Sequence, residues 1–354
     1  MKTLACGFPE VKQLAAALAG DPVALAALAA APRAAELAKA HRVGPALALR
    51  ARRLGIDVPW HRSLIATTAH LLRVRERLAA ASEALGAAGV PWVPVKGCDL
   101  GARVYAQPEE RPVGDIDLLV SEADYPRAHA TLAAAGWRSL YEGERAERYL
   151  REEGYAWALV DATGLLLEVH VRLWGLVPAG LAPALLAAAV PDPFLGPAGR
   201  RLPLAQAWLL AAVHAWLNPP PRPLLSWWDL ERIAAAEPAI ADEVVRLAEE
   251  WDLQLPAGLA AAQAAELWGS EPNREIARRL RLRPLERLAA RRGEAASLRG
   301  IVLARLLSGR ASRAGWKSLP RQVWAHPGVV EQETAADRSW PARRFAHVMR
   351  AFRR

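Results

Sequence analysis

Residues 114–120 read Gly114-Asp115-Ile116-Asp117-Leu118-Leu119-Val120, a strand-like pattern in which acidic and apolar side chains alternate. Successive side chains of a strand point to opposite faces, so Asp115 and Asp117 share one face while Ile116 and Leu118 share the other. Two neighbouring carboxylates repel each other and resist burial unless a cation or a basic group balances them. Because Mg²⁺ prefers oxygen ligands, the pattern favours a metal site on a strand spanning 113–120. A solvated strand face is the simpler alternative.

A second alternating run lies at 165–173, where Glu168, His170 and Arg172 fall on one face and apolar residues on the other. With residues 155–160 and a turn at 161–164, this run predicts a β-hairpin. If its second strand pairs with the aspartate strand, Glu168 approaches both aspartates. Three carboxylates can hold two metal ions, or one metal ion plus a base for an attacking hydroxyl. A polar outer edge of the sheet is the alternative for His170 and Arg172.

Basic residues precede the aspartate strand at two places. Lys96 and Gly97 end a predicted strand, 90–95, and precede a predicted helix, 99–105. Glycine lets a phosphate approach the backbone closely, a helix N-terminus favours anions, and lysine adds a positive point charge. Arg111, just before the aspartate strand, is a second candidate for contacting phosphate.

The chain divides into three regions by pattern. Residues 1–89 are rich in strong helix formers with apolar spacings of three and four, residues 90–177 are mixed α/β, and residues 178–354 return to helices. The sequence therefore predicts an α+β fold: a small mixed sheet flanked by N-terminal and C-terminal helical regions. Predicted helices are 125–135, 205–217, 229–236, 241–251, 258–268 and 275–292.

Composition restricts the class of protein. A hydrophobic content of 53% with 23% charged residues is typical of a globular protein and excludes wholesale disorder. Two cysteines, Cys6 and Cys98, cannot form a disulfide framework. With no apolar run of membrane-spanning length and no signal-peptide pattern, we expect a cytoplasmic protein without a transmembrane segment.

The positive charge is concentrated near the C-terminus. Residues 271–354 contain 20 Lys and Arg against 7 Asp and Glu, whereas the whole chain has a net charge of +9. A basic segment suits a polyanionic partner such as RNA, a nucleotide or a membrane surface. A compositional excess of arginine and alanine is the alternative. Residues 340–354 form a short basic amphipathic stretch that suits either RNA or membrane contact, or packing on the body as a terminal helix.

These motifs occur together in a recognisable order. Lys96-Gly97-x-x-Leu100, Tyr105, Arg111, the 114–120 segment and Leu167-Glu-Val-His170-x-x-Leu173 follow one another along the chain. In this order they resemble the uncharacterised nucleotidyltransferase family of the DNA polymerase beta-like superfamily. The resemblance is sharp over about residues 90–175. It extends more weakly to His214 and Trp227-Trp228-Asp229-Leu230, which are similar to the C-terminal helical half of that family.

The resemblance implies catalytic and metal-binding roles for Asp115, Asp117 and Glu168. It also implies nucleotide contacts for a second set of residues, namely Lys96, Gly97, Arg111 and His170. The implied reaction is transfer of a nucleoside monophosphate from an NTP, bound with Mg²⁺ or alternatively Mn²⁺, to a hydroxyl-bearing acceptor, with release of pyrophosphate. The acceptor stays open among a small molecule, a peptide or protein, and RNA.

The chain departs from the superfamily at the phosphate-contacting turn. The superfamily has Gly-Ser there, whereas this chain has Lys96-Gly97 without the serine, and Gly97 lies eighteen residues before Asp115. This departure keeps a second hypothesis open: a non-catalytic nucleotide-binding or partner-binding module that retains the fold.

Overall fold

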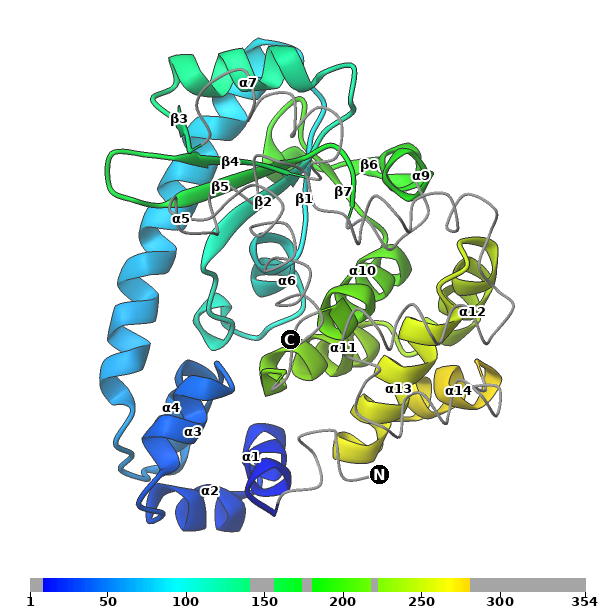
Figure 1. Ribbon diagram of the computed structural model, residues 1–354. Helices are drawn as coiled ribbons and strands as arrows, with labels where there is room; N and C mark the ends of the chain where they lie inside the picture. Colours follow the sequence, from blue (N-terminus) through cyan, green and yellow to red (C-terminus); the bar gives the residue numbers. More distant parts are fainter. Residues whose placement is uncertain (1–8, 141–155, 174–179, 218–221, 281–354) are drawn as a thin grey trace, which may run out of the picture.

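A five-stranded sheet lies at the centre of the computed structural model, which describes residues 9–140, 156–173, 180–217 and 222–280 (Figure 1). The strand order is β1-β2-β5-β4-β3. The strands are β1 (Val93–Pro94), β2 (Asp115–Leu119), β3 (Arg138–Ser139), β4 (Ala156–Val160) and β5 (Leu166–His170). β2 and β5 run parallel, and the other neighbouring strands run antiparallel. Helices flank this mixed sheet, so the α+β prediction is confirmed.

The register places the two acidic strands side by side. Asp117 pairs with Glu168 across β2 and β5, and Leu119 pairs with His170. The predicted hairpin is confirmed as β4–β5, and its turn is closed by Asp161, whose Oδ1 accepts hydrogen bonds from the backbone N–H of Thr163 (2.8 Å) and Leu165 (3.0 Å). The condition that brings Glu168 to the aspartate strand is therefore met.

Helices of the N-terminal region lead to the sheet. They are α1 (Pro9–Ala19), α2 (Pro22–Ala29), α3 (Ala34–Ala40), α4 (Gly44–Leu54) and α5 (His61–Ala87). Asp21 caps α2 by accepting hydrogen bonds from the N–H groups of Val23 and Ala24, ahead of Pro22 in the first helical turn. The long helix α5 runs from this group of helices up to the sheet, where α7 (Tyr125–Ala134) packs beside it (Figure 1).

Helices after the sheet form a second group (Figure 1). They are α9 (Leu181–Ala188), α10 (Leu204–Leu217), α11 (Leu224–Ala236), α12 (Ala241–Glu250), α13 (Gln254–Trp268) and α14 (Glu271–Arg279), with a small sheet of β6 (Val190–Pro191) and β7 (Arg200–Arg201). Three of these helices, α11, α13 and α14, begin four or five residues before the predicted starts at 229, 258 and 275. The predicted continuation over 281–292 and the amphipathic stretch 340–354 lie outside the described residues.

Two segments before β2 differ from prediction. The strand predicted over 90–95 is reduced to the two residues of β1, because Pro91 and Pro94 lack the N–H groups that a ladder needs. The next helix, α6 (Gly97–Arg103), begins two residues earlier than the predicted 99, directly after Lys96.

The two faces of the sheet pack against different cores. Ile116, Leu118, Leu167 and Val169 join residues of α5 and α7 in one apolar cluster. Leu119, on the aspartate face, belongs to a second cluster that unites α6 with the N-terminal and C-terminal helices. The predicted division of side chains between faces is therefore confirmed. Among the described residues, no helix combines the length and the apolar character needed to cross a membrane.

Candidate metal and nucleotide site

Asp117 is the centre of the charged face of the sheet. Its Oδ1 accepts a hydrogen bond from Nζ of Lys96 at 2.6 Å and lies 2.8 Å from Nε2 of His170. The residue is only 2% exposed. Burial opposes its charged form, but the hydrogen bond with His170 and the charge of Lys96 outweigh burial and hold the pKa of Asp117 well below its ordinary range. Asp117 is thus an ionised carboxylate at neutral pH, with two basic partners.

Glu168 lies beside this pair on the neighbouring strand. Its Oε2 is 3.4 Å from Nε2 of His170, and ligand atoms of Asp117, Glu168 and His170 all lie within 4.8 Å of one another. His170 is fully buried and Glu168 half-buried. Burial, with the nearby charge of Asp117, raises the pKa of Glu168. Two carboxylates and an imidazole at this spacing could hold a divalent metal ion.

Asp115 occupies the same face of β2, one side-chain position before Asp117. It is half-buried, and its carboxylate is not a member of the compact Asp117–Glu168–His170 group that the described residues form. Burial, followed by repulsion from Asp117, raises the pKa of Asp115, while Lys96 and Arg42 partly offset this rise. The face thus carries three carboxylates of which two are destabilised as anions, the electrostatic condition that an added cation relieves.

Lys96 reaches Asp117 from a strained backbone. Its φ is 56° and its ψ −126°, a region that side-chain-bearing residues seldom occupy. The turn is held on one side by a hydrogen bond from Val95 N–H to the Asp117 carbonyl (3.0 Å) and on the other by Leu100 N–H to the Lys96 carbonyl (3.0 Å). Burial opposes the charge of Lys96, but Asp117 outweighs it and raises the pKa of the lysine. The lysine is therefore a fixed positive charge beside the carboxylates.

The sequence of this chain matches a known protein family. The profile of a family described as "Uncharacterised nucleotidyltransferase" matches residues 29–269, about two thirds of the chain. The chain belongs to this nucleotidyltransferase family. Among curated proteins, none matches the sequence significantly. The matched range includes all of the predicted site residues as well as α10 and α11, so the resemblance seen in the motifs is confirmed.

Arg111 of this nucleotidyltransferase-family chain does not point its guanidinium at open space. Nε and Nη2 donate to the two carboxylate oxygens of Asp229 on α11 at 3.0 and 2.7 Å, and the hydroxyl of Tyr105 donates to Asp229 at 2.6 Å. Burial opposes the charge of Arg111, but Asp229 outweighs it and raises the arginine's pKa. The geometry assigns Arg111 to this buried pair. For the predicted phosphate contact, Arg111 would have to use the N–H groups that do not bind Asp229.

Gly97 allows this pair to lie directly under α6. A Cβ atom at position 97 would overlap Nη1 of Arg111 and would come within 3.3 Å of Cγ2 of Val113. Gly97 was predicted to admit a phosphate to the backbone. In the structure, the space that its missing side chain leaves is filled by a guanidinium.

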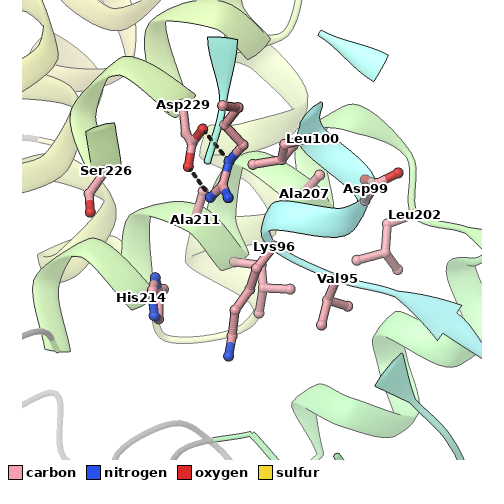
Figure 2. Close-up of a pocket in the computed structure, with 12 residues that line it drawn as sticks. Val95, Lys96, Asp99, Leu100, Leu202, Ala207, Ala211, His214, Ser226 and Asp229 are labelled. Carbon is pink, nitrogen blue, oxygen red and sulfur yellow. Dashed lines mark hydrogen bonds and ion pairs between the residues drawn. The ribbon is translucent and has the colours of Figure 1, made fainter. Parts of the chain in front are cut away.

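A pocket opens between α6, α10 and α11 beside this pair (Figure 2). Apart from His214, the residues of α10 that line it are apolar, and polar groups come from Lys96, Asp99, Arg111, His214, Ser226 and Asp229. Figure 2 shows the side chains of Lys96 and His214 projecting toward the same side of the pocket. Burial, then the charge of Lys96, lowers the pKa of His214 to about 4, so its imidazole is neutral at pH 7.

The sequence did not reveal which partners these residues would find. Tyr105 and Asp229 were part of the family resemblance, but the contacts that Arg111 and Tyr105 make with Asp229 bridge 118 and 124 residues of chain and have no local pattern. His214, which was also part of the resemblance, lines the pocket.

Proposed function

We propose that the protein is a Mg²⁺-dependent nucleotidyltransferase, which moves a nucleoside monophosphate from an NTP to a hydroxyl-bearing acceptor and releases pyrophosphate. The observation that carries this proposal is the group formed by Asp117, Glu168 and His170, with Lys96 held beside it. Membership of a nucleotidyltransferase family over residues 29–269 supports the reaction class.

The residues present fit a divalent metal ion. Asp117 and Glu168 would hold it, with Asp115 as the further carboxylate of the same strand face and His170 as a neighbouring donor. The raised pKa values of Asp115 and Glu168 support this assignment, since burial and the nearby charge of Asp117 both disfavour their anions and a bound cation would offset both effects. When bound, such an ion neutralises phosphate charge and lowers the pKa of a coordinated hydroxyl.

The chain's own residues would then position the substrates. Phosphoryl-type transfer depends mainly on orientation and charge neutralisation. Lys96, fixed by its turn, supplies a positive charge next to the carboxylates. Where Asp115 and Asp117 hold a single ion, an Oε of Glu168 is the atom that we assign to accept the proton of the acceptor hydroxyl, because a base whose pKa is raised toward neutrality is more effective. The buried Arg111–Asp229 pair orients α6, and with it Lys96.

Calorimetric titration of the four NTPs, with and without Mg²⁺, tests the proposal without knowledge of the acceptor. We expect at least one NTP to bind only with Mg²⁺, and the binding to disappear in the Asp115→Asn/Asp117→Asn double variant. Asp124→Asn is the matched control, because Asp124 lies outside the site and pairs with Ser121 and Arg127 at the start of α7. Binding that ignores both the metal and the double substitution would contradict the proposal.

Turnover gives the second arm of this test. Once an acceptor is identified, Asp117→Ala should lower pyrophosphate release by about 10²-fold or more, by analogy with the loss of one group that stabilises a transition state. Full turnover by this variant would show the assignment to be wrong.

One observation favours a second candidate, a nucleotide-binding or partner-binding module without turnover. Oδ1 of Asp117 is already contacted by Lys96 and His170, so the chain supplies its own positive charge where a metal would bind. This candidate predicts nucleotide binding that survives Glu168→Gln, with no pyrophosphate released for any acceptor. The main proposal also includes a cytoplasmic location and an acceptor that is a small molecule, a peptide or protein, or RNA.

A further inference from the structure

Arg42 lies in the turn between α3 and α4, with a backbone that usually requires glycine. Its φ is 57°, in the left-handed region. The turn closes the C-terminus of α3 through hydrogen bonds from Arg42 N–H to Lys39 O (3.0 Å) and from Val43 N–H to Ala38 O (2.9 Å). Glycine is the usual residue at this position of such a helix end, because a Cβ atom is disfavoured there. An arginine here makes the backbone conformation less favourable, which indicates a role for its side chain.

The neighbouring residue fixes this turn to the site. His41 is buried; its Nδ1 accepts a hydrogen bond from Leu224 N–H at 3.2 Å, and its carbonyl accepts one from Leu225 N–H at 3.2 Å. Both donors belong to the start of α11, the helix that carries Asp229. Arg42 is thus held in a defined place relative to the nucleotidyltransferase site although it comes from the N-terminal helices.

The guanidinium of Arg42 lies beside the start of the aspartate strand. Its Nη2 is 3.6 Å from the position that a Cβ atom of Gly114 would occupy. Its charge is close enough to be attracted by Asp115 and Asp229 and repelled by Arg111. Yet the residue is exposed, and within the described ranges its side chain makes no hydrogen bond or ion pair. Arg111, by contrast, has its charge matched by Asp229.

We propose that Arg42 binds the polyphosphate of the NTP donor, on the Asp115 side of the site, while Lys96 serves the Asp117 side. The inference rests on the proposed function and adds a donor-binding residue to it. Asp115 and Asp117 are two residues apart on one strand, about 6.6 Å, so two cations at these positions match a chain of phosphates better than a single phosphate. Arginine suits this role because its planar fork of donors binds phosphate oxygens in pairs.

The decisive variant is Arg42→Gly, which removes the guanidinium and relieves the left-handed backbone together. Titration with Mg²⁺–ATP and with Mg²⁺–tripolyphosphate should show affinity lowered by about tenfold to a hundredfold, the range for a charged hydrogen bond. The midpoint of unfolding should stay equal or rise, because glycine adopts this φ without strain. Arg42→Lys should retain part of the affinity, since it keeps the charge and loses the paired donors.

Arg33→Ala is the matched control. Arg33 precedes α3 in the same group of helices, and its exposed side chain contacts only Glu36 among the described residues, at 3.4 Å. Its removal should leave both affinities unchanged. The loss for Arg42→Gly should also shrink as salt is raised, since exposed charges are screened.

Two results would overturn the inference alone: wild-type affinity in Arg42→Gly, or a loss of affinity that is matched by a fall in the unfolding midpoint. The second would show that Arg42 has a structural role. If the wild-type protein binds neither probe, the proposed function fails as well. Adenosine without phosphates separates the cases further, because its binding should be the same in wild-type and Arg42→Gly protein.

Discussion

The two faces of the β2–β5 pair both carry buried residues, but they are chemically opposite. On one face, Leu118 and Leu167 are fully buried and contact only a packed apolar cluster. On the other, Asp117 is 2% exposed and His170 fully buried, although both are polar. Burial therefore does not distinguish these four residues. The difference lies in how each face satisfies its atoms: the first by packing, the second by hydrogen bonds and opposite charges.

This difference explains why the charged face contributes less to the stability of the fold than the apolar face. A carboxylate out of water is tolerated only with close partners, and Asp117 has two, while Asp115 and Glu168 are left with raised pKa values. Such a face is retained at a cost in stability where it serves binding or catalysis. The following predictions test that contrast in order of decreasing effect.

The largest effect should come from placing a charge on the apolar face. Leu167→Asp buries a carboxylate at a fully buried position with no basic partner, which costs at least several kcal/mol against a typical total stability of about 5–15 kcal/mol. We expect the variant to lose its cooperative thermal unfolding transition, which circular dichroism measures. The control Leu167→Met conserves volume and should cost less than about 1.5 kcal/mol. A cooperatively folded Leu167→Asp protein would show that the apolar face is not needed.

A smaller but still large effect should come from the buried ion pair that supports the charged face. Asp229→Ala leaves Arg111 buried without its counter-ion, and breaking a buried pair on one side typically costs about 3–5 kcal/mol. Urea denaturation measures this loss. Glu243→Ala, which breaks the exposed pair of α12 with Arg246, is the control and should change the midpoint far less. Equal effects of the two substitutions would argue against a supporting role for the buried pair.

The smallest effect is expected for Glu168→Gln, and its sign should be opposite to that of Asp117→Asn. The raised pKa of Glu168 means that the folded state binds its proton more tightly than the unfolded state, so ionised Glu168 destabilises the fold at neutral pH. Asp117 has a lowered pKa, so its charge stabilises the fold above the pKa of the unfolded chain, and that stability is lost as pH falls. At pH 7, Glu168→Gln should raise the unfolding midpoint and Asp117→Asn should lower it.

Thermal unfolding of the two variants, Glu168→Gln and Asp117→Asn, at pH 7 and near pH 4 tests these opposite shifts. Close to pH 4 the advantage of Glu168→Gln should vanish, because wild-type Glu168 is then protonated in the folded state as well. Shifts in the same direction for both variants at pH 7 would contradict the electrostatic description of the face.

Sequence reasoning was successful where a local period decides the structure. The alternation at 114–120 and 165–173 assigned each side chain to the correct face, and the hairpin turn at 161–164 followed from the same pattern. It was less successful for bounds: two prolines cut β1 to Val93–Pro94, and α11 begins at Leu224 rather than at 229.

Partners distant in sequence could not be predicted. Nothing near Arg111 shows that its guanidinium pairs with Asp229, and nothing near Arg42 shows that its turn is fixed to α11 through His41. These contacts depend on how helices cross, which no local spacing encodes. The roles of Asp115, Asp117, Glu168, Lys96, Gly97 and His170 in binding a nucleotide stay predictions until the titrations are made.

The bond between Arg111 and Asp229 has a consequence for synthesis of the protein. The two residues are separated by 118 positions, so at about 5–20 residues per second the aspartate leaves the ribosome roughly 6–24 s after the arginine. In the later part of that interval, once β5 has been translated, the nascent β2–β5 sheet has its apolar side chains, but Arg111 has no counter-ion. The buried pair beside α6 can therefore be completed only after α11 has been translated, although every residue of the β2–β5 pair leaves the ribosome before it.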